Sequence, residues 1–469
     1  MDEEVQALQH NRTWVLVPRP AHTNIVGSKW VFRTKYLHNG SIECFKARLV
    51  AKGYTQILGL DYTNTFNPVI KATTIRVVLS LTVTNRWPLR QLDVKKTFLN
   101  DTLTENVYME QPPGYIDSRR VDTSLFVFHQ QPNIIYLLLY VDDIIITGNN
   151  SSLLDSFARK LNSEFATKDL GSLNYFLGLE ATSTIDGIFI SQLKYARDIL
   201  TRAQLLDSKP VHTPMIVSHH LTSDSPAFSD PTLYRSLIGA LQCLTITRPD
   251  IAHAVNFVSQ FLHAPTADHF LAVKRILRYV KGTLHFGLTF RPSAAPGALV
   301  AYFDADWAGC PDTRCSTSGY SIYLGDNLVS WSAKKQPTVS CSSCESEYRA
   351  LATTAVELLW LTHLLHDLKV SISPKPILLC DNKSVIFLSS NPVSHKRAKH
   401  VELDYHFLQE LVVAGKLRTQ YVPSHLQVVD LFTKSVSRPL FDFFRAKLHV
   451  CSNPTLNLRG GVKDTDTLP

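Results

Sequence analysis

Short runs of apolar and β-branched residues, separated by polar turns, characterise residues 1–150. Residues 30–36 and 41–50 alternate apolar and polar side chains, which predicts two strands. Residues 73–84 have a helical pattern, and a further strand is predicted to end near Asp93. This first segment is therefore expected to be an α+β domain.

Two adjacent carboxylates interrupt an otherwise apolar stretch of this segment. The runs 134–139 and 144–146 predict two strands of a hairpin that turns at Asp142 and Asp143. Aspartate is an ordinary turn residue, but burying two ionised carboxylates requires a cationic partner, commonly a divalent metal. The local pattern leaves two interpretations open, a solvated turn and a metal site.

Helical periodicity dominates the second segment, residues 151–292. One hairpin is expected across Tyr175 to Ile190, and proline-containing stretches separate the helices. The last helix has a basic face, and each of its residues is expected to belong to a solvated surface. Its members are Lys274, Arg275, Arg278 and Lys281. The expected helices are 151–165, 193–203, 232–244, 250–262 and 266–280.

The third segment, residues 297–435, predicts the element order βββαβααβα. Its longest helix, over 342–368, places leucine and alanine at helical spacing on one face. The expected strands are 299–305, 319–324, 328–332, 377–380 and 417–422. Residues 436–469 are expected to form a C-terminal tail.

Acidic residues occupy particular places in this third pattern. Asp304 and Asp381 end two predicted strands, Glu347 lies early in the long helix, and Asp430 begins the last helix. If the two strands are neighbours, the carboxylates meet at one edge of the sheet. Such a cluster cannot ionise fully without cations, and it suits two Mg²⁺ ions about 4 Å apart acting on a phosphodiester.

Composition adds limited constraints. The chain has 469 residues, 45% of them hydrophobic, which is enough for two to four domain cores. The net charge of +8 suits a polyanionic partner without proving one. With no signal peptide and no bilayer-spanning run, an intracellular and not a secreted protein is expected. The eight cysteines permit a zinc site drawn from Cys310, Cys315, Cys341 and Cys344, but their spacing has no standard form.

Longer motifs resemble one family throughout the chain. The sequence is similar to the Pol polyprotein of copia-type long-terminal-repeat retrotransposons, as a fragment holding reverse transcriptase and ribonuclease H. The reverse-transcriptase motifs are residues 11–18, 46–53, 91–95, 107–114 and 139–144; the thumb and connection motifs are 169–171, 175–178, 234–239, 247–251 and 273–279. The ribonuclease H motifs are 304–309, 316–319, 345–350, 380–382, 399–400 and 429–434.

The resemblance implies fold and domains. Residues 1–150 correspond to reverse-transcriptase fingers and palm, 151–292 to a helical thumb and connection, and 297–435 to a ribonuclease H-like domain with a mixed five-stranded sheet and helices. The fold class is thus α+β and α/β multidomain. It also implies RNA template, DNA primer, RNA–DNA hybrid and dNTPs as partners, association with other Pol copies, no membrane, and the cytoplasmic virus-like particles of intact members.

The resemblance also implies residue roles. Asp93, Asp142 and Asp143 would hold two Mg²⁺ ions at the polymerase site, and Asp304, Glu347, Asp381 and Asp430 would hold two at the ribonuclease H site, with Mn²⁺ as the alternative ion. His425 would help product release or shuttle a proton. The implied substrate contacts are Lys46 and Arg48 at the triphosphate, Phe98 at the ribose 2′ position, and Tyr140 beside the aspartates. A core phenylalanine and exposed basic residues are the alternatives for Phe98, Lys46 and Arg48.

One departure from the family pattern concerns the polymerase. After Arg120 the chain continues at Val121, without the family's stretch that lines the nucleotide pocket and one side of the palm. Its absence should expose apolar sheet and leave the pocket without a wall. Hydrolysis of the RNA strand of hybrids is therefore expected, with DNA synthesis absent or very weak. The alternative is a catalytically dead remnant that acts at most as a nucleic-acid-binding protein.

Overall fold

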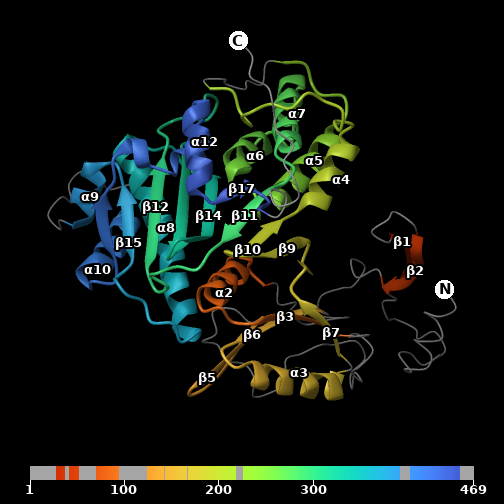
Figure 1. Ribbon diagram of the computed structural model, residues 1–469. Helices are drawn as coiled ribbons and strands as arrows, with labels where there is room; N and C mark the ends of the chain where they lie inside the picture. Colours follow the sequence, from red (N-terminus) through yellow and green to blue (C-terminus); the bar gives the residue numbers. More distant parts are fainter. Residues whose placement is uncertain are drawn as a thin grey trace, which may run out of the picture.

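The computed structural model describes residues 28–36, 42–51, 70–94, 124–141, 143–165, 167–217, 225–390 and 402–454 of the chain. The described residues form one two-stranded and three five-stranded β-sheets. Figure 1 shows their arrangement. The expected mixed α/β class is confirmed. Phe98 and Asp142 lie outside the described residues, as do the side chains of Lys46 and Arg48.

The expected first strands pair as an antiparallel hairpin. β1 (Ser28–Tyr36) lies against β2 (Ile42–Ala51), with Arg33 opposite Lys46 and Val31 opposite Arg48. The two strands agree with the alternating pattern of the sequence.

The N-terminal sheet has the strand order β4-β5-β6-β3-β7 and is antiparallel throughout. Helix α3 (Ser151–Phe165) covers one face through a small core that includes Leu154, Ala158 and Ile144. The opposite face contributes Tyr136 and Ile145 to the large core. The strands are β3 (Leu89–Val94), β4 (Leu125–Gln130), β5 (Asn133–Tyr140), β6 (Asp143–Gly148) and β7 (Thr167–Ser172).

The central sheet has the order β17-β11-β10-β9-β8. It consists of β8 (Tyr175–Phe176), β9 (Leu179–Thr184), β10 (Gly187–Ser191), β11 (Phe286–Phe290) and β17 (Val450–Ser452), and its first three strands confirm the expected hairpin. The helices of this region are α4 (Leu193–Arg202), α5 (Pro231–Leu244), the short 3₁₀ helix η3 (Pro249–Ile251), α6 (Ala252–Ser259) and α7 (Ala267–Gly282).

The expectation of a C-terminal tail from residue 436 is wrong for residues 438–452. They form α12 (Arg438–Lys447) and β17, and β17 pairs with β11 at the edge of the central sheet. Phe441 and Phe444 of α12 are buried. The end of the described chain therefore returns to the middle of the molecule, because the apolar face of α12 is buried there.

The C-terminal sheet has the order β14-β13-β12-β15-β16. β12 (Leu299–Ala305) is antiparallel to β13 (Thr317–Leu324) and parallel to β15 (Ile377–Cys380), β13 is antiparallel to β14 (Asn327–Lys335), and β15 is parallel to β16 (Arg418–Tyr421). The helices are α8 (Ser343–Asp367), α9 (Lys383–Ser390), α10 (Glu402–Val413) and α11 (Asp430–Thr433), with the 3₁₀ turn η6 (Ser424–Leu426) between β16 and α11. The predicted order βββαβααβα is confirmed.

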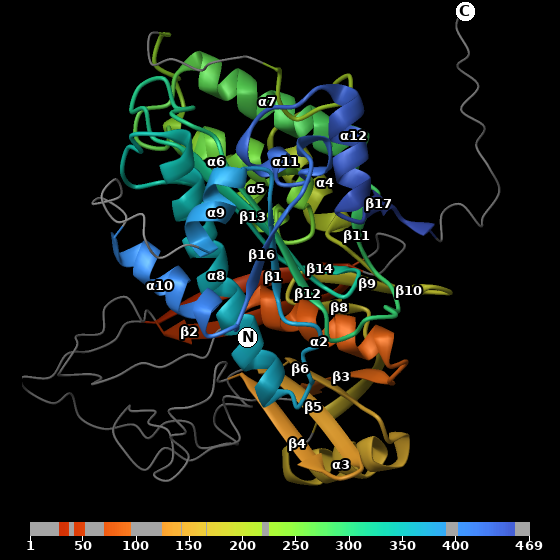
Figure 2. The same ribbon diagram turned by 90° about the vertical axis from the view of Figure 1, so that its left-hand side faces the viewer.

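One large core includes residues of all three five-stranded sheets, beside the small core under α3. Helix α2 (Ala72–Thr84) packs against edge strand β14 (Figure 2). The guanidinium of Arg76 lies 3.7 Å from the ring centre of Trp331. Asn327 Nδ2 donates to Ser80 Oγ at 3.0 Å, and the Tyr136 hydroxyl donates to the Leu368 carbonyl at 2.7 Å. The N-terminal and C-terminal sheets are thus joined directly through α2 and β5.

A buried ion pair stabilises the middle of the molecule. The Arg248 guanidinium donates twice to Asp250, at 2.9 and 2.7 Å, and the two side chains are 3% and 0% exposed. The Tyr279 hydroxyl donates to the same carboxylate at 2.6 Å, and Arg445 of α12 donates to that hydroxyl at 3.2 Å. The network links η3, α7 and α12, and α6, which follows η3 directly, packs against α11.

Candidate metal centres

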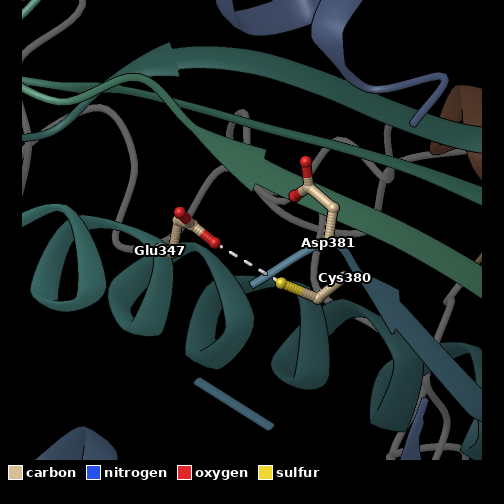
Figure 3. Close-up of side chains that lie close together, drawn as sticks. All are labelled: Glu347, Cys380 and Asp381. Carbon is tan, nitrogen blue, oxygen red and sulfur yellow. Dashed lines mark hydrogen bonds between the residues drawn. The ribbon is translucent and has the colours of Figure 1, made fainter. Parts of the chain in front are cut away.

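Three potential ligand atoms converge at the carboxyl end of β15. One oxygen each of Glu347 and Asp381 and the Cys380 sulfur lie within 4.8 Å of one another (Figure 3). The Cys380 thiol donates to Glu347 Oε2 at 3.4 Å, and Asn382 Nδ2 donates to Glu347 Oε1 at 3.0 Å. Glu347 reaches this point from the first turns of α8, so its carboxylate is oriented by two neighbours from the end of the strand.

Asp304 and Asp430 complete the cluster from the other side. Because β12 and β15 are parallel neighbours, their carboxyl ends meet at one edge of the sheet. The Thr433 hydroxyl donates to Asp304 Oδ2 at 2.5 Å, and the Lys434 ammonium lies 2.8 Å from Asp430 Oδ1 and 3.9 Å from Asp304 Oδ2. We call Asp304, Glu347, Asp381 and Asp430 the four-carboxylate cluster.

A glycine on β13 lets α11 approach the sheet. Gly319 lies opposite Asp304 on β13, and a Cβ atom there would come within 2.8 Å of Phe432 and 3.0 Å of Thr433. Glycine is required by this close approach, which places Asp430 and Thr433 beside β12.

The electrostatics of the cluster indicate a deficit of cations. Burial raises the pKa of Glu347 to about 7, and the nearby Asp304 and Asp381 add to the rise while the Asn382 hydrogen bond opposes it. Burial likewise raises the pKa of Asp430 to about 6, against the effect of Lys434. It also raises the pKa of Asp304, which Lys434 and Thr433 partly counter. An all-oxygen donor set that is reluctant to ionise alone fits hard divalent cations such as Mg²⁺.

Some residues of this edge were not assigned a role from the sequence. Asp306 accepts a hydrogen bond from the Thr317 amide, and burial raises its pKa to about 6. Lys434, Thr433 and Asn382 contact the cluster directly. These four residues lie inside the motifs that carry the family resemblance, and those motifs are the sequence signal that could have identified them. His425 lies on η6 with an exposed side chain, and the structure shows no contact between it and the four-carboxylate cluster.

The expected polymerase carboxylates are partly described. Asp93 of β3 lies directly opposite Asp143 of β6, and Tyr140 opposes the same residue from β5, which confirms the predicted hairpin. Gln91 Nε2 donates to Asp143 Oδ1 at 3.3 Å and to the Tyr175 carbonyl at 2.7 Å. This buried amide of β3 therefore connects Asp143 of β6 to β8, the first strand of the hairpin expected across Tyr175 to Ile190.

The outer part of the N-terminal sheet carries exposed aromatic side chains. Phe126 and Phe128 of β4 are 40% and 45% exposed, and they lie opposite Leu137 and Ile135. They share the face that α3 covers over β6 and β3, but β4 is the edge strand beyond it (Figure 2). Two apolar side chains are thus only partly covered at this edge.

Two other expectations have a structural answer. The four cysteines weighed for zinc lie in the described part of the chain, where the grouping with metal-ligand spacing is Glu347, Cys380 and Asp381 instead. The basic face of α7 is not simply solvated, since three of its side chains donate hydrogen bonds to the segment between α4 and α5. Arg275 bonds Thr213, Arg278 bonds the Lys209 carbonyl and Lys281 bonds the Ser208 carbonyl.

Comparison with known proteins identifies the chain's relatives. The family model described as reverse transcriptase (RNA-dependent DNA polymerase) matches residues 11–136 and again 119–217. The Pol polyprotein of transposon RE1 from Arabidopsis thaliana is 44% identical over 494 aligned positions, covering 97% of this chain and 34% of the relative. The Pol polyprotein of transposon TNT 1-94 from Nicotiana tabacum is 34% identical over 504 positions, covering 97% of this chain and 38% of the relative.

The chain therefore spans about a third of the length of these curated relatives. A solved foamy viral protease-reverse transcriptase in complex with double-stranded DNA aligns with a TM-score of 0.44 at 11% identity, over 84% of this chain and 66% of that one. Within the described residues, none of the helices is both long and apolar enough to cross a membrane. By its sequence matches along nearly its whole length, the chain belongs to the copia-type retrotransposon Pol family, with a reverse-transcriptase region matched over residues 11–217.

Proposed function

We propose that this protein cleaves the RNA strand of RNA–DNA hybrids at the four-carboxylate cluster and has lost most or all of its DNA synthesis. The observation that carries the proposal is the convergence of Asp304, Glu347, Asp381 and Asp430 at one sheet edge, with raised pKa values in three of them. Two Mg²⁺ ions, or Mn²⁺, would supply the charge that activates water and stabilises the leaving oxygen.

The chain's own residues would orient that chemistry. The Thr433 hydroxyl fixes one oxygen of Asp304, while Asn382 and Cys380 fix the two oxygens of Glu347. Ligands held in this way need little rearrangement when a cation binds. The exposed His425 is proposed as a mobile group that assists proton transfer or product release.

Three observations support the loss of polymerase function. The reverse-transcriptase model matches in two pieces that overlap at residues 119–136, as a deletion near Arg120 would produce. The alignment with the RE1 polyprotein spans 494 positions, more than the 469 residues of this chain, so the relative has positions without a counterpart here. Phe126 and Phe128 lie exposed on the sheet that the missing helices would cover.

Asp93, Asp142 and Asp143 are proposed as the remaining polymerase ligands, with Tyr140, Lys46, Arg48 and Phe98 as contacts of primer, triphosphate and ribose. RNA template, DNA primer, hybrid and dNTPs are the proposed partners, and association with intact Pol copies in cytoplasmic particles would be the setting in a cell.

The hydrolase is tested with purified full-length chain and a labelled RNA–DNA hybrid in Mg²⁺. Asp381→Asn should lower cleavage by at least about a hundredfold, because it removes a ligand of the cluster. Asp326→Asn is the matched control, since Asp326 lies in the turn at the opposite end of the same sheet. No cleavage by the unaltered chain, or cleavage that survives Asp381→Asn, contradicts the proposal. Salt-sensitive hybrid binding without cleavage would indicate the catalytically dead remnant instead.

A further inference from the structure

A single lysine supplies the positive charge in the four-carboxylate cluster. Within the described residues, both ion pairs found for these carboxylates come from Lys434, which lies 2.8 Å from Asp430 and 3.9 Å from Asp304. The two acidic side chains are 11% and 6% exposed, whereas that of Lys434 is 48% exposed. Its ammonium therefore enters a buried acidic site from the protein surface.

Lys434 faces one half of the cluster. Its ammonium approaches Asp430 Oδ1 and Asp304 Oδ2 and is the counter-ion of these two carboxylates. Glu347 and Asp381 are instead oriented by neutral groups, the Asn382 amide and the Cys380 thiol.

The cluster is therefore asymmetric before any metal binds. On the Glu347–Asp381 side, a divalent ion meets no resident cation among the described residues. On the Asp304–Asp430 side, it meets the Lys434 ammonium, which already lies against both carboxylates. Two cations a few ångströms apart repel strongly in a partly buried site, so one must leave.

We propose that Lys434 is a resident counter-ion that occupies the Asp304–Asp430 half of the cluster, so that a divalent ion binds there only when the ammonium withdraws. The inference rests on the proposed function only in taking the cluster as a metal site. The long, half-exposed side chain can withdraw into solvent without moving α11, because the main-chain N–H of Lys434 donates a hydrogen bond to the Asp430 carbonyl at 3.0 Å. Lys434 is thus a positioning residue that makes the two metal affinities unequal.

The experiment is a calorimetric titration of the full chain with Mn²⁺, without hybrid. The unaltered protein should bind one ion tightly and a second weakly. Lys434→Met should tighten the second dissociation constant by about tenfold, because it removes the competing charge. Lys434→Arg, which keeps the charge, should stay close to the unaltered protein. Lys416→Met is the control, since Lys416 is exposed and precedes β16 at the opposite end of the sheet.

A second measurement covers the metal-free state. In EDTA, Lys434→Met should melt below the unaltered protein, and saturating Mn²⁺ should remove the difference. If Lys434→Met does not fold, Lys434→Gln provides the same comparison with a smaller change of shape. Unchanged Mn²⁺ affinities in the neutral variants, or no Mn²⁺ binding at all, overturn the inference. Tighter Mn²⁺ binding in the neutral variants without hybrid cleavage supports the counter-ion role of Lys434 and contradicts the proposed hydrolase. Hybrid cleavage with both Mn²⁺ affinities unchanged supports the hydrolase and contradicts the counter-ion role.

Discussion

The two carboxylate sites of this protein are built on sheets in different ways. In the C-terminal sheet, the four-carboxylate cluster draws its members from β12, α8, the end of β15 and α11, so that helices close the site around the strands. In the N-terminal sheet, Asp93 and Asp143 face each other on two paired strands, with Gln91 as the described side-chain contact. One site is enclosed by packed helices and the other depends on strand pairing.

This difference bears on the proposed deletion. Strand pairing between β3 and β6 is held by main-chain bonds and by the α3 core, which do not depend on the segment proposed to be missing. A pocket for a nucleotide and template needs additional walls, and under the proposed deletion the exposed Phe126 and Phe128 lie where such a wall is lost. Carboxylate placement is thus necessary for such chemistry and not sufficient, since substrates must also be positioned.

The largest effect should come from restoring the wall that the proposed deletion removes. Inserting the family's pocket-lining segment between Arg120 and Val121 should raise primer extension on an RNA template by about 10³-fold, because positioning of the nucleotide is regained. Hybrid cleavage should stay unchanged. A glycine-serine insert of equal length is the control. Extension by the uninserted chain at the rate of an intact relative would show that the wall is dispensable.

A strong effect on stability should follow from Asp250→Asn. The substitution leaves the Arg248 guanidinium, 3% exposed, without its carboxylate, and loss of one partner of a buried pair costs about 3–5 kcal/mol. Because α6 connects this network to α11, hybrid cleavage should be lost at lower urea concentrations.

Asp442→Asn is the control for that prediction. Asp442 is 42% exposed and pairs with Arg445 and Arg438 at the surface, so its loss should cost less than about 1 kcal/mol in the free energy of unfolding. Equal destabilisation by the two substitutions in urea denaturation would mean that the Arg248–Asp250 pair has no special structural role.

The sequence predicted the regular elements of the ribonuclease H region well, because they follow simple patterns. The stripe of Leu351, Ala355, Leu358, Leu361 and Leu365 is buried as its spacing required, and the parallel strands 299–305 and 377–380 bring Asp304 and Asp381 together. Local patterns could not show that Gly319 admits α11, since that depends on a residue far along the chain.

The elements that were missed share a physical reason. β7 is a polar edge strand, and β17 has three residues, so neither has a recognisable hydrophobic period. The expected helix over 250–262 begins as η3 at Pro249 because Asp250 turns inward to Arg248. The role of Lys434 also depends on distances that no local pattern contains.

A moderate effect should appear in the pH dependence of the metal-free protein. The folded state raises the pKa of Glu347 to about 7 and that of Asp430 to about 6, so it binds more protons than the unfolded chain in this range. Their contribution to stability is therefore lost as pH rises through these values, and in EDTA the melting temperature should rise by a few degrees from pH 8 to 6.5.

Glu347→Gln should remove most of that rise, and saturating Mg²⁺ should flatten it because the metal favours the ionised carboxylates. The window ends at pH 6.5 because burial lowers the pKa of His253 to about 4, so that its protonation opposes folding in more acidic solution. A melting temperature that falls between pH 8 and 6.5 would contradict the raised pKa values.

The smallest effect should come from Gln91→Ala in the N-terminal sheet. The substitution removes the hydrogen bonds to Asp143 and to the Tyr175 carbonyl, and it should cost about 1–2 kcal/mol in the free energy of unfolding. Gln242→Ala, at an exposed position of α5, is the control and should be nearly neutral. Hybrid cleavage under native conditions should be unchanged in both variants, because the four-carboxylate cluster contains no group that Gln91 holds. A loss of cleavage in Gln91→Ala alone would mean that the two sites are coupled through the shared core, and the contrast between an enclosed and an open site would then need to include that coupling.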